Sequence, residues 1–254
     1  MKVLIACEES QEVCKAYRRR GIEAYSCDLQ ECSGGHPEWH IVADVLTVLR
    51  GGTFVTQAGT IIVIDKWDKM IAHPVCTYLT ISAEWAYKDP DYDRYPGIGY
   101  HQKLKPGTLF GAKRRQAREE SLEFVCKLLN APIEVKVIEN PIGVISTRIF
   151  WYIGGEAGPA EWKVFPRKTI GCIKGQVIQP HQFGDDASKA TALYIVNSVK
   201  LKPTKHFPPR IVNGKKRWGN QTDGGQNKLP PSSDRAKLRS KTYPGIADAI
   251  AEQI

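Results

Sequence analysis

The sequence has no apolar run that approaches the roughly 18 residues a membrane-spanning helix requires. Its short apolar start at residues 3–6 meets Glu8 and Glu9 too soon for a signal peptide. These two absences predict a cytoplasmic protein without a membrane partner. The 254 residues suffice for one medium domain with a small appendage, whose core needs no disulfides. The seven cysteines are odd in number and scattered, so we expect reduced thiols, one of which is a candidate nucleophile.

A zinc motif of ordinary spacing is also absent. The pattern C-x4-C-x3-H-x3-H occurs once, but it is compressed and interrupted by two glycines and a proline. Residues 36–38 match the H-x-E of zinc nucleobase deaminases, yet Cys76 is not followed by the second cysteine of P-C-x-x-C. We therefore expect no metal and keep a zinc-dependent nucleobase deaminase as a minor alternative. The candidate ligands are Cys27, Cys32, His36 and His40.

Acidic residues are scarce in one segment. Residues 200–241, here called the basic segment, carry twelve Lys and Arg against two acidic residues, so of the total charge of +9 the rest of the chain contributes −1. This asymmetry predicts a polyanionic partner bound through its phosphates, and we expect DNA. The alternative is a solvated loop, because Gly, Pro, Asn and Ser are abundant there. The strongest candidate contacts are Lys215, Lys216 and Arg217, and Trp218 beside them is expected to pack under the loop.

Short apolar runs alternate with helical patterns along the chain, which is typical of a doubly wound α/β domain with a mostly parallel sheet. Alternation on both sides of residues 57–59 predicts an inserted β-hairpin over 51–64. The tyrosine-rich residues 85–111 follow no single period and are interpreted as a functional loop. The predicted strands are 2–7, 22–27, 40–45, 70–72, 135–138, 177–179 and 192–196. The predicted helices are 10–20 with Ser10 as cap, 113–130 and 246–254.

Two predicted strands end in reactive groups that would meet at one edge of the sheet. Cys76 follows one strand and Glu139 ends another. A thiol and a carboxylic acid can together add a nucleophile to an electron-poor ring and protonate a ring nitrogen. Asp28 and Asp44 end two further strands, where carboxylates accept hydrogen bonds from ribose hydroxyls or an exocyclic amine. The alternatives are a buried structural cysteine, a surface glutamate, and aspartates that cap helices or turns.

The order of these features resembles the DNA (cytosine-5-)-methyltransferases, in the compact form often found in phage genomes. The resemblance extends from Val3 to Ile254, apart from residues 51–64 and the basic segment. The matching segments are the loop of Ala6, Cys7, Glu8, Glu9 and Ser10, the acids Asp28 and Asp44, the nucleophile motif 73–76 with Pro74, the pair Glu139 and Asn140, and the closing motif 239–250.

The resemblance implies an S-adenosylmethionine-dependent enzyme that methylates carbon 5 of cytosine in DNA through a covalent adduct. Residues 1–199 and 242–254 would form the catalytic domain, and residues 200–241 the DNA-contacting, target-recognition part, with a monomer favoured. The implied catalytic residues are Cys76, Glu139, Pro74 and Asn140. The implied cofactor-binding residues are Ala6, Cys7, Glu8, Ser10, Asp28, Asp44, Ser240 and Thr242. The implied DNA-binding residues are Lys189, Lys215, Lys216, Arg217, Arg114 and Arg115.

Two positions keep a second interpretation open. Val75 stands directly before Cys76, where the family usually has proline, and Lys189 is the only cation in 188–192, where the family has paired arginines. The main alternative is therefore a non-catalytic DNA-binding protein with a methyltransferase-like fold. Binding of the cofactor would separate the two interpretations.

Overall fold

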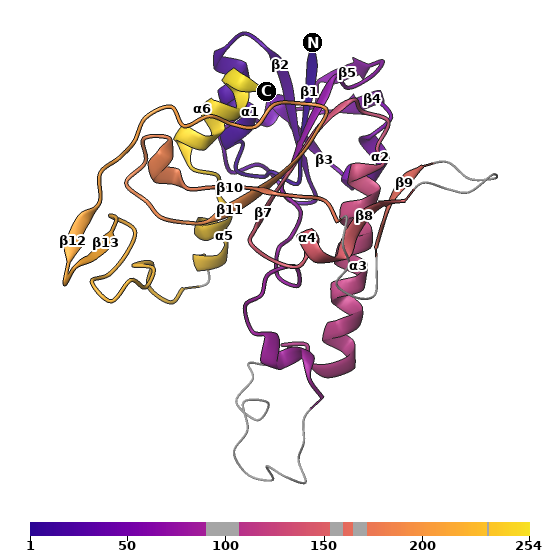
Figure 1. Ribbon diagram of the computed structural model, residues 1–254. Helices are drawn as coiled ribbons and strands as arrows, with labels where there is room; N and C mark the ends of the chain where they lie inside the picture. Colours follow the sequence, from indigo (N-terminus) through magenta and orange to yellow (C-terminus); the bar gives the residue numbers. More distant parts are fainter. Residues whose placement is uncertain (90–106, 153–159, 165–171, 233) are drawn as a thin grey trace. The chain divides into compact units, whose positions relative to one another are not determined.

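The computed structural model describes residues 1–89, 107–152, 160–164, 172–232 and 234–254. The described residues form two compact units (Figure 1). The first, here called the sheet unit, comprises Met1–Pro74, Ala131–Glu139 and Gly175–Ile254, and the second, the helix unit, comprises Val75–Asn130 and Asn140–Lys174. No helix among these residues has the length and the apolar character needed to cross a membrane.

A seven-stranded sheet forms the centre of the sheet unit. Its order is β10-β11-β7-β6-β1-β2-β3. The five strands from β7 to β3 pair in parallel, and β10 pairs with β11 antiparallel, which confirms the predicted mostly parallel α/β fold. The strands are β1 (Lys2–Ala6), β2 (Glu23–Asp28), β3 (His40–Val42), β6 (Lys69–Ala72), β7 (Val135–Pro141), β10 (Gln176–Ile178) and β11 (Thr191–Val196).

The strand order reverses between β1 and β6. From β1 the chain builds β2 and β3 on one side, and then returns to place β6 and β7 on the other. Ligands of open α/β sheets bind at the carboxyl ends of the strands beside such a switch point. The carboxyl ends of β1, β2, β3, β6 and β7 share one edge because these strands are parallel. The functional site is therefore expected at this edge.

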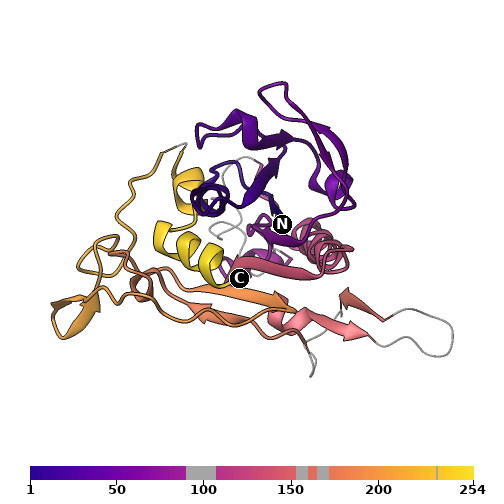
Figure 2. The same cartoon turned by 90° about the horizontal axis from the view of Figure 1, so that it is seen from above.

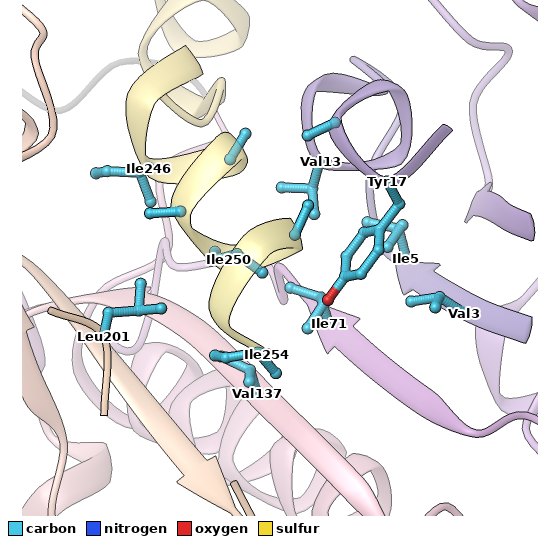
Figure 3. Close-up of a cluster of buried hydrophobic side chains, with 14 of the residues drawn as sticks. Val3, Ile5, Val13, Tyr17, Ile71, Val137, Leu201, Ile246, Ile250 and Ile254 are labelled. Atoms are coloured by element: carbon cyan, nitrogen blue, oxygen red, sulfur yellow. The ribbon is translucent and has the colours of Figure 1, made fainter. Parts of the chain in front are cut away.

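Two helices, α1 (Glu12–Arg19) and α6 (Pro244–Gln253), lie side by side in the sheet unit (Figures 1 and 2). Val13 and Tyr17 of α1 and Ile250 of α6 are wholly buried against sheet residues such as Ile71 (Figure 3). Burial of each aliphatic side chain stabilises the folded state by roughly 1.5–3 kcal/mol. This cluster therefore holds α1 and α6, near the two chain ends, against the central strands. The sheet unit also contains the short helix α2 (Val45–Val48).

The predicted hairpin is present as β4 (Gly52–Val55) and β5 (Ile61–Ile64). A second hairpin, β12 (Arg210–Val212) and β13 (Lys215–Arg217), lies in the basic segment, where no strand was predicted. Its turn residues Asn213 and Gly214 both have positive φ, the conformation that an Asn-Gly hairpin turn requires. The dipeptide Asn213-Gly214 therefore indicates a hairpin turn, although no hairpin was predicted here. Helix α5 (Arg235–Ser240) follows.

The helix unit is built around α3 (Gly111–Leu129), close to the predicted helix 113–130. Leu122, Val125, Leu128 and Leu129 form its buried stripe, as predicted. The chain continues through α4 (Ile145–Arg148) into the hairpin of β8 (Ile149–Tyr152) and β9 (Glu161–Val164), which was not predicted. Most of the predicted tyrosine-rich loop, residues 90–106, lies outside the described residues.

Candidate active site at the carboxyl ends of the strands

The loop between β1 and α1 is held by Glu8, not by Ser10 as predicted. The Glu8 carboxylate is buried and accepts the N–H groups of Val13 at 2.7 Å and Cys14 at 3.2 Å. Burial raises the pKa of Glu8, and these two hydrogen bonds oppose the rise. Both oxygens therefore satisfy orphan donors in the first turn of α1. This arrangement argues against Glu8 as a ligand of the cofactor.

Asp28 and Asp44 come together with Cys7 at the predicted edge. Burial raises the pKa of the Cys7 thiol, and the charges of Asp28 and Asp44 add to the rise, so the three side chains are electrostatic neighbours. Asp28 accepts the Gln30 N–H at 3.0 Å, and Asp44 accepts the Leu46 N–H at 3.0 Å as the cap of α2. Each aspartate uses one oxygen in these bonds, so the other is available to a hydroxyl or amine donor.

Two of the four candidate zinc ligands, His40 and Cys27, are buried inside the sheet unit. His40 is fully buried, with Nδ1 2.8 Å from the Ser26 hydroxyl and Nε2 2.8 Å from the Gln30 carbonyl. Cys27 is buried within β2. In the described part of the chain, no group of three or more His, Cys, Asp and Glu could hold a metal ion. The pattern of Cys27, Cys32, His36 and His40 therefore gives the deaminase alternative no support.

His73, just after the end of β6, meets the buried Glu139 near the end of β7. His73 Nδ1 lies 3.0 Å from Glu139 Oε2, and the two side chains are 11% and 10% exposed. Burial alone would lower the pKa of His73, but the hydrogen bond to Glu139 and the charges of Glu139 and Glu8 raise it. Burial alone would raise the pKa of Glu139, but His73 and Lys189 lower it. Both shifts favour an ionised Glu139 beside a protonated His73. His73 was not among the predicted catalytic residues.

The closing motif lies beside a separate cavity. Thr242 is buried and lines a cavity of about 490 Å³ together with Glu12, Lys241 and Tyr243, whereas Asp28 and Asp44 do not line it. The Ser240 hydroxyl donates to the carbonyl of Lys237. The sequence predicted that Ser240 and Thr242 bind the cofactor with the two aspartates. Of these four residues, Thr242 alone lines this cavity.

Cys76 lies in the helix unit and begins a tight turn. Its carbonyl accepts the N–H groups of Leu79 at 3.0 Å and Thr80 at 3.2 Å. Val75 before it is 73% exposed, while Pro74 is buried at the end of the sheet unit. Asn140 is buried at the start of the second segment of the helix unit.

Gly143 fixes the turn that carries Cys76. The Val144 N–H donates to the Leu79 carbonyl at 2.8 Å, and Thr80 bridges to Gly143. A Cβ at position 143 would stand 1.9 Å from the Leu79 carbonyl oxygen, a backbone atom that cannot rotate away. The close approach of these two backbones therefore requires glycine.

We expect Gly143→Ala to lower the free energy of unfolding by about 3 kcal/mol, at the upper end of overpacking costs, because the Cys76 turn must shift. Urea unfolding followed by circular dichroism measures the effect. Gly224→Ala is the matched control, because the nearest atom to a Cβ there is 3.9 Å away and φ is unrestricted. Equal stability of the two variants would contradict this role of Gly143.

Arg114 and Arg115 were predicted to contact DNA, but the structure gives them contacts within the helix unit. Arg114 is buried, stacks over Tyr78 and Tyr87, and donates to the Leu109 carbonyl at 3.1 Å. Arg115 pairs with Asp89 at 3.0 Å. A buried guanidinium cannot meet a phosphate without leaving its rings, so Arg114 is not favoured as a DNA contact.

Four cations of the basic segment lie on the β12–β13 hairpin, on two opposite faces: Arg210, Lys215, Lys216 and Arg217. In its register Arg210 faces Arg217, and Ile211 faces Lys216. Because side chains alternate along a strand, Lys215 and Arg217 share one face with Arg210, whereas Lys216 lies on the other. Lys215 and Lys216 are exposed, and Arg217 donates to the Asp223 carbonyl at 3.0 Å.

Trp218 and Lys189 have internal partners. Trp218 packs as predicted, stacked on His181 with ring centroids 4.2 Å apart and its indole N–H donating to the Phe207 carbonyl at 3.3 Å. Lys189 donates to the Arg239 carbonyl at 2.9 Å, and its charge lowers the pKa of Glu139. Lys189 therefore belongs to the surroundings of the His73–Glu139 pair.

Comparison with known proteins finds a likeness to solved structures. No protein-family model and no curated protein matches the chain. Among solved structures, the chain is similar to a protein described as a "putative DNA modification methyltransferase" encoded within an E. coli prophage. The identity is 9% and the TM-score 0.39, with 82% of this chain and 52% of that chain covered. This chain thus spans about half the length of that protein, and function must be inferred from the residues of the site.

Proposed function

We propose that the protein transfers a methyl group from S-adenosylmethionine to carbon 5 of cytosine in DNA. The observation that carries the proposal is the buried, hydrogen-bonded carboxyl of Glu139 at the carboxyl end of β7, beside the strand end that leads to Cys76. Cys76 follows His73 by three residues, so their Cα atoms are at most about 11 Å apart. The chain length therefore allows the thiol to reach a base that contacts Glu139.

The chemistry divides between these two residues. The Cys76 thiolate adds to ring carbon 6, and Glu139 delivers a proton to the ring nitrogen N3, which makes carbon 5 nucleophilic. S-adenosylmethionine, when bound, supplies the electrophilic methyl group. Solvent water then takes the proton from carbon 5, N3 returns its proton to Glu139, and departure of the Cys76 thiolate restores the aromatic ring. The base must leave the double helix to reach these groups.

The edge at β1, β2 and β3 fits one end of the cofactor. Asp28 and Asp44 each have a carboxylate oxygen available to a donor, as ribose hydroxyls and an adenine amine require. Cys7 has a φ of 59°, a left-handed conformation that L residues rarely adopt and that is often found at functional sites. Asp28, Asp44 and the backbone at Cys7 would therefore hold the nucleoside part.

We expect Asp28→Ala and Asp44→Ala each to weaken the binding of S-adenosylmethionine by about 1 to 3 kcal/mol, the range for losing a hydrogen bond to a charged group. Isothermal titration calorimetry measures the change. Asp65→Ala is the control, because Asp65 is an exposed acid outside the proposed site. Unchanged affinity in both aspartate variants would show that these strand ends only cap turns and helices.

The alternative of a non-catalytic DNA-binding protein is supported by the exposed cations of the basic segment, which need no cofactor to bind phosphates. The same calorimetry separates the two functions. A protein that binds DNA but shows no heat of binding with S-adenosylmethionine is the non-catalytic one.

A further inference from the structure

We propose that His73 holds the proton that Glu139 delivers to the base, so that the acid of this site is the His73–Glu139 pair. This inference rests on the proposed function. His73 does not contact the base in this account. It is a positioning residue that acts through the carboxyl of Glu139.

The sheet itself places the two side chains together. Strands β6 and β7 pair in parallel with Ala72 opposite Ile138, so the next residues, His73 just after β6 and Glu139 within β7, lie side by side. The His73 N–H donates to the carbonyl of Ala6 at 2.9 Å, which anchors its backbone to β1 as well. The 3.0 Å hydrogen bond between Nδ1 and Oε2 therefore follows from strand register. It does not depend on one flexible side chain.

The surroundings favour one proton shared by the pair. The groups that act on His73 are Glu139 from β7, Glu8 from the loop after β1, and Lys189 from the segment before β11. Two carboxylates near one imidazole favour its protonated form. Within the described residues, His73 Nε2 is buried without a hydrogen-bond partner, so Nδ1 makes the one hydrogen bond of the ring. The proton of the pair thus lies on the bond between Nδ1 and Glu139.

An ionised Glu139 has no proton to give to the base. His73 supplies this proton to the Glu139 carboxylate. The Nδ1–H proton passes to the Glu139 carboxylate, which leaves neutral imidazole and a carboxylic acid. As the Cys76 thiolate forms the bond to carbon 6, the carboxylic acid protonates N3, and the electron pair of the 5,6 double bond moves to join carbons 5 and 4. When the thiolate leaves, N3 returns its proton to Glu139 and then to His73. The pair ends with the proton with which it began.

The test is the pH profile of single-turnover methyl transfer by the wild-type protein and by His73→Asn. Asparagine can still donate an N–H to Glu139, but it cannot store a proton. We expect the wild-type rate to fall as the pH rises through the deprotonation of the pair. In His73→Asn the proton must reside on Glu139 alone, whose ordinary pKa lies below that of histidine. The rate of His73→Asn should therefore begin to fall at a pH at least about one unit lower than the rate of the wild type does. At pH 8 the variant should be about tenfold slower than the wild type.

Controls distinguish folding, positioning and function. His36→Asn should keep the wild-type profile, because His36 pairs with Glu38 away from Glu139. His73→Gln provides a second variant if His73→Asn fails to fold by circular dichroism. A variant whose profile has the wild-type shape, at the full rate or uniformly reduced, would overturn the role of His73. Absence of methyl transfer by the wild-type protein at every pH would overturn the proposed function, and this inference with it.

Discussion

Cys76→Ala is expected to reduce methyl transfer by at least about 10⁴-fold, as removal of a catalytic nucleophile generally does. Alanine cannot form the bond to carbon 6, and without that bond carbon 5 is a poor nucleophile toward the methyl donor. DNA and cofactor binding should stay largely intact, because Cys76 is half-buried in a turn and contributes no strand or helix to the core. Transfer of radiolabelled methyl groups to DNA measures the rate.

Cys32→Ala is the matched control, because Cys32 is also a half-buried cysteine. It should retain the wild-type rate. The wild-type protein and Cys32→Ala should also form a covalent adduct with DNA that contains 5-fluorocytosine, because fluorine at carbon 5 blocks the final loss of a proton. Cys76→Ala should form no adduct. Methylation by Cys76→Ala at the wild-type rate would exclude Cys76 as the nucleophile.

DNA binding through the basic segment should depend strongly on salt. If six of its twelve cations contact phosphates, the plot of log K against log salt should have a slope of about −5, at roughly 0.9 per contact. The hairpin geometry sharpens this expectation, because only one face of β12–β13 can lie on the duplex. The face with Lys215 and Arg217 carries more cations. The double variant Lys215→Gln, Arg217→Gln should therefore flatten the slope by about 2. Fluorescence anisotropy over a salt series measures it.

Lys216→Gln is the internal control, since Lys216 lies on the opposite face beside the exposed Ile211. Its slope should equal that of the wild-type protein. A slope near zero in the intact protein would show that the basic segment is a solvated surface. A change in Lys216→Gln with none in the double variant would assign the contact to the other face.

The sequence was most informative where local pattern and tertiary structure agree. The run Val3 to Ala6 predicts a strand buried on both faces, and all four residues are wholly buried in β1. Alternation of apolar and polar residues over 51–64 predicts the hairpin. The structure has the matching alternation of burial, because Ile62 and Ile64 are buried while their neighbours are exposed. Asp28, the last residue of β2, and Asp44, shortly after β3, lie at strand ends as their sequence positions predict. Parallel strands bring their carboxyl ends to one edge whatever the intervening chain does.

The sequence was least informative where a contact depends on three-dimensional packing. Glu8 caps α1 although it lies four residues before the helix begins. The usual capping pattern does not include such an offset, and it favoured Ser10 instead. The partnership of His73 and Glu139 joins residues 66 positions apart through the register of β6 and β7, which no local period reveals. Gly143 is required by one carbonyl of another segment.

The central claim is that the protein methylates cytosine at carbon 5, and the most direct measurement is mass spectrometry of nucleosides. DNA would be incubated with the protein and S-adenosylmethionine, digested to nucleosides and analysed, with Cys76→Ala as the parallel sample. The account predicts 5-methyl-2′-deoxycytidine in the wild-type digest and none above background in the variant digest. A wild-type digest without it, or one in which another nucleoside carries the new methyl group, would contradict the account.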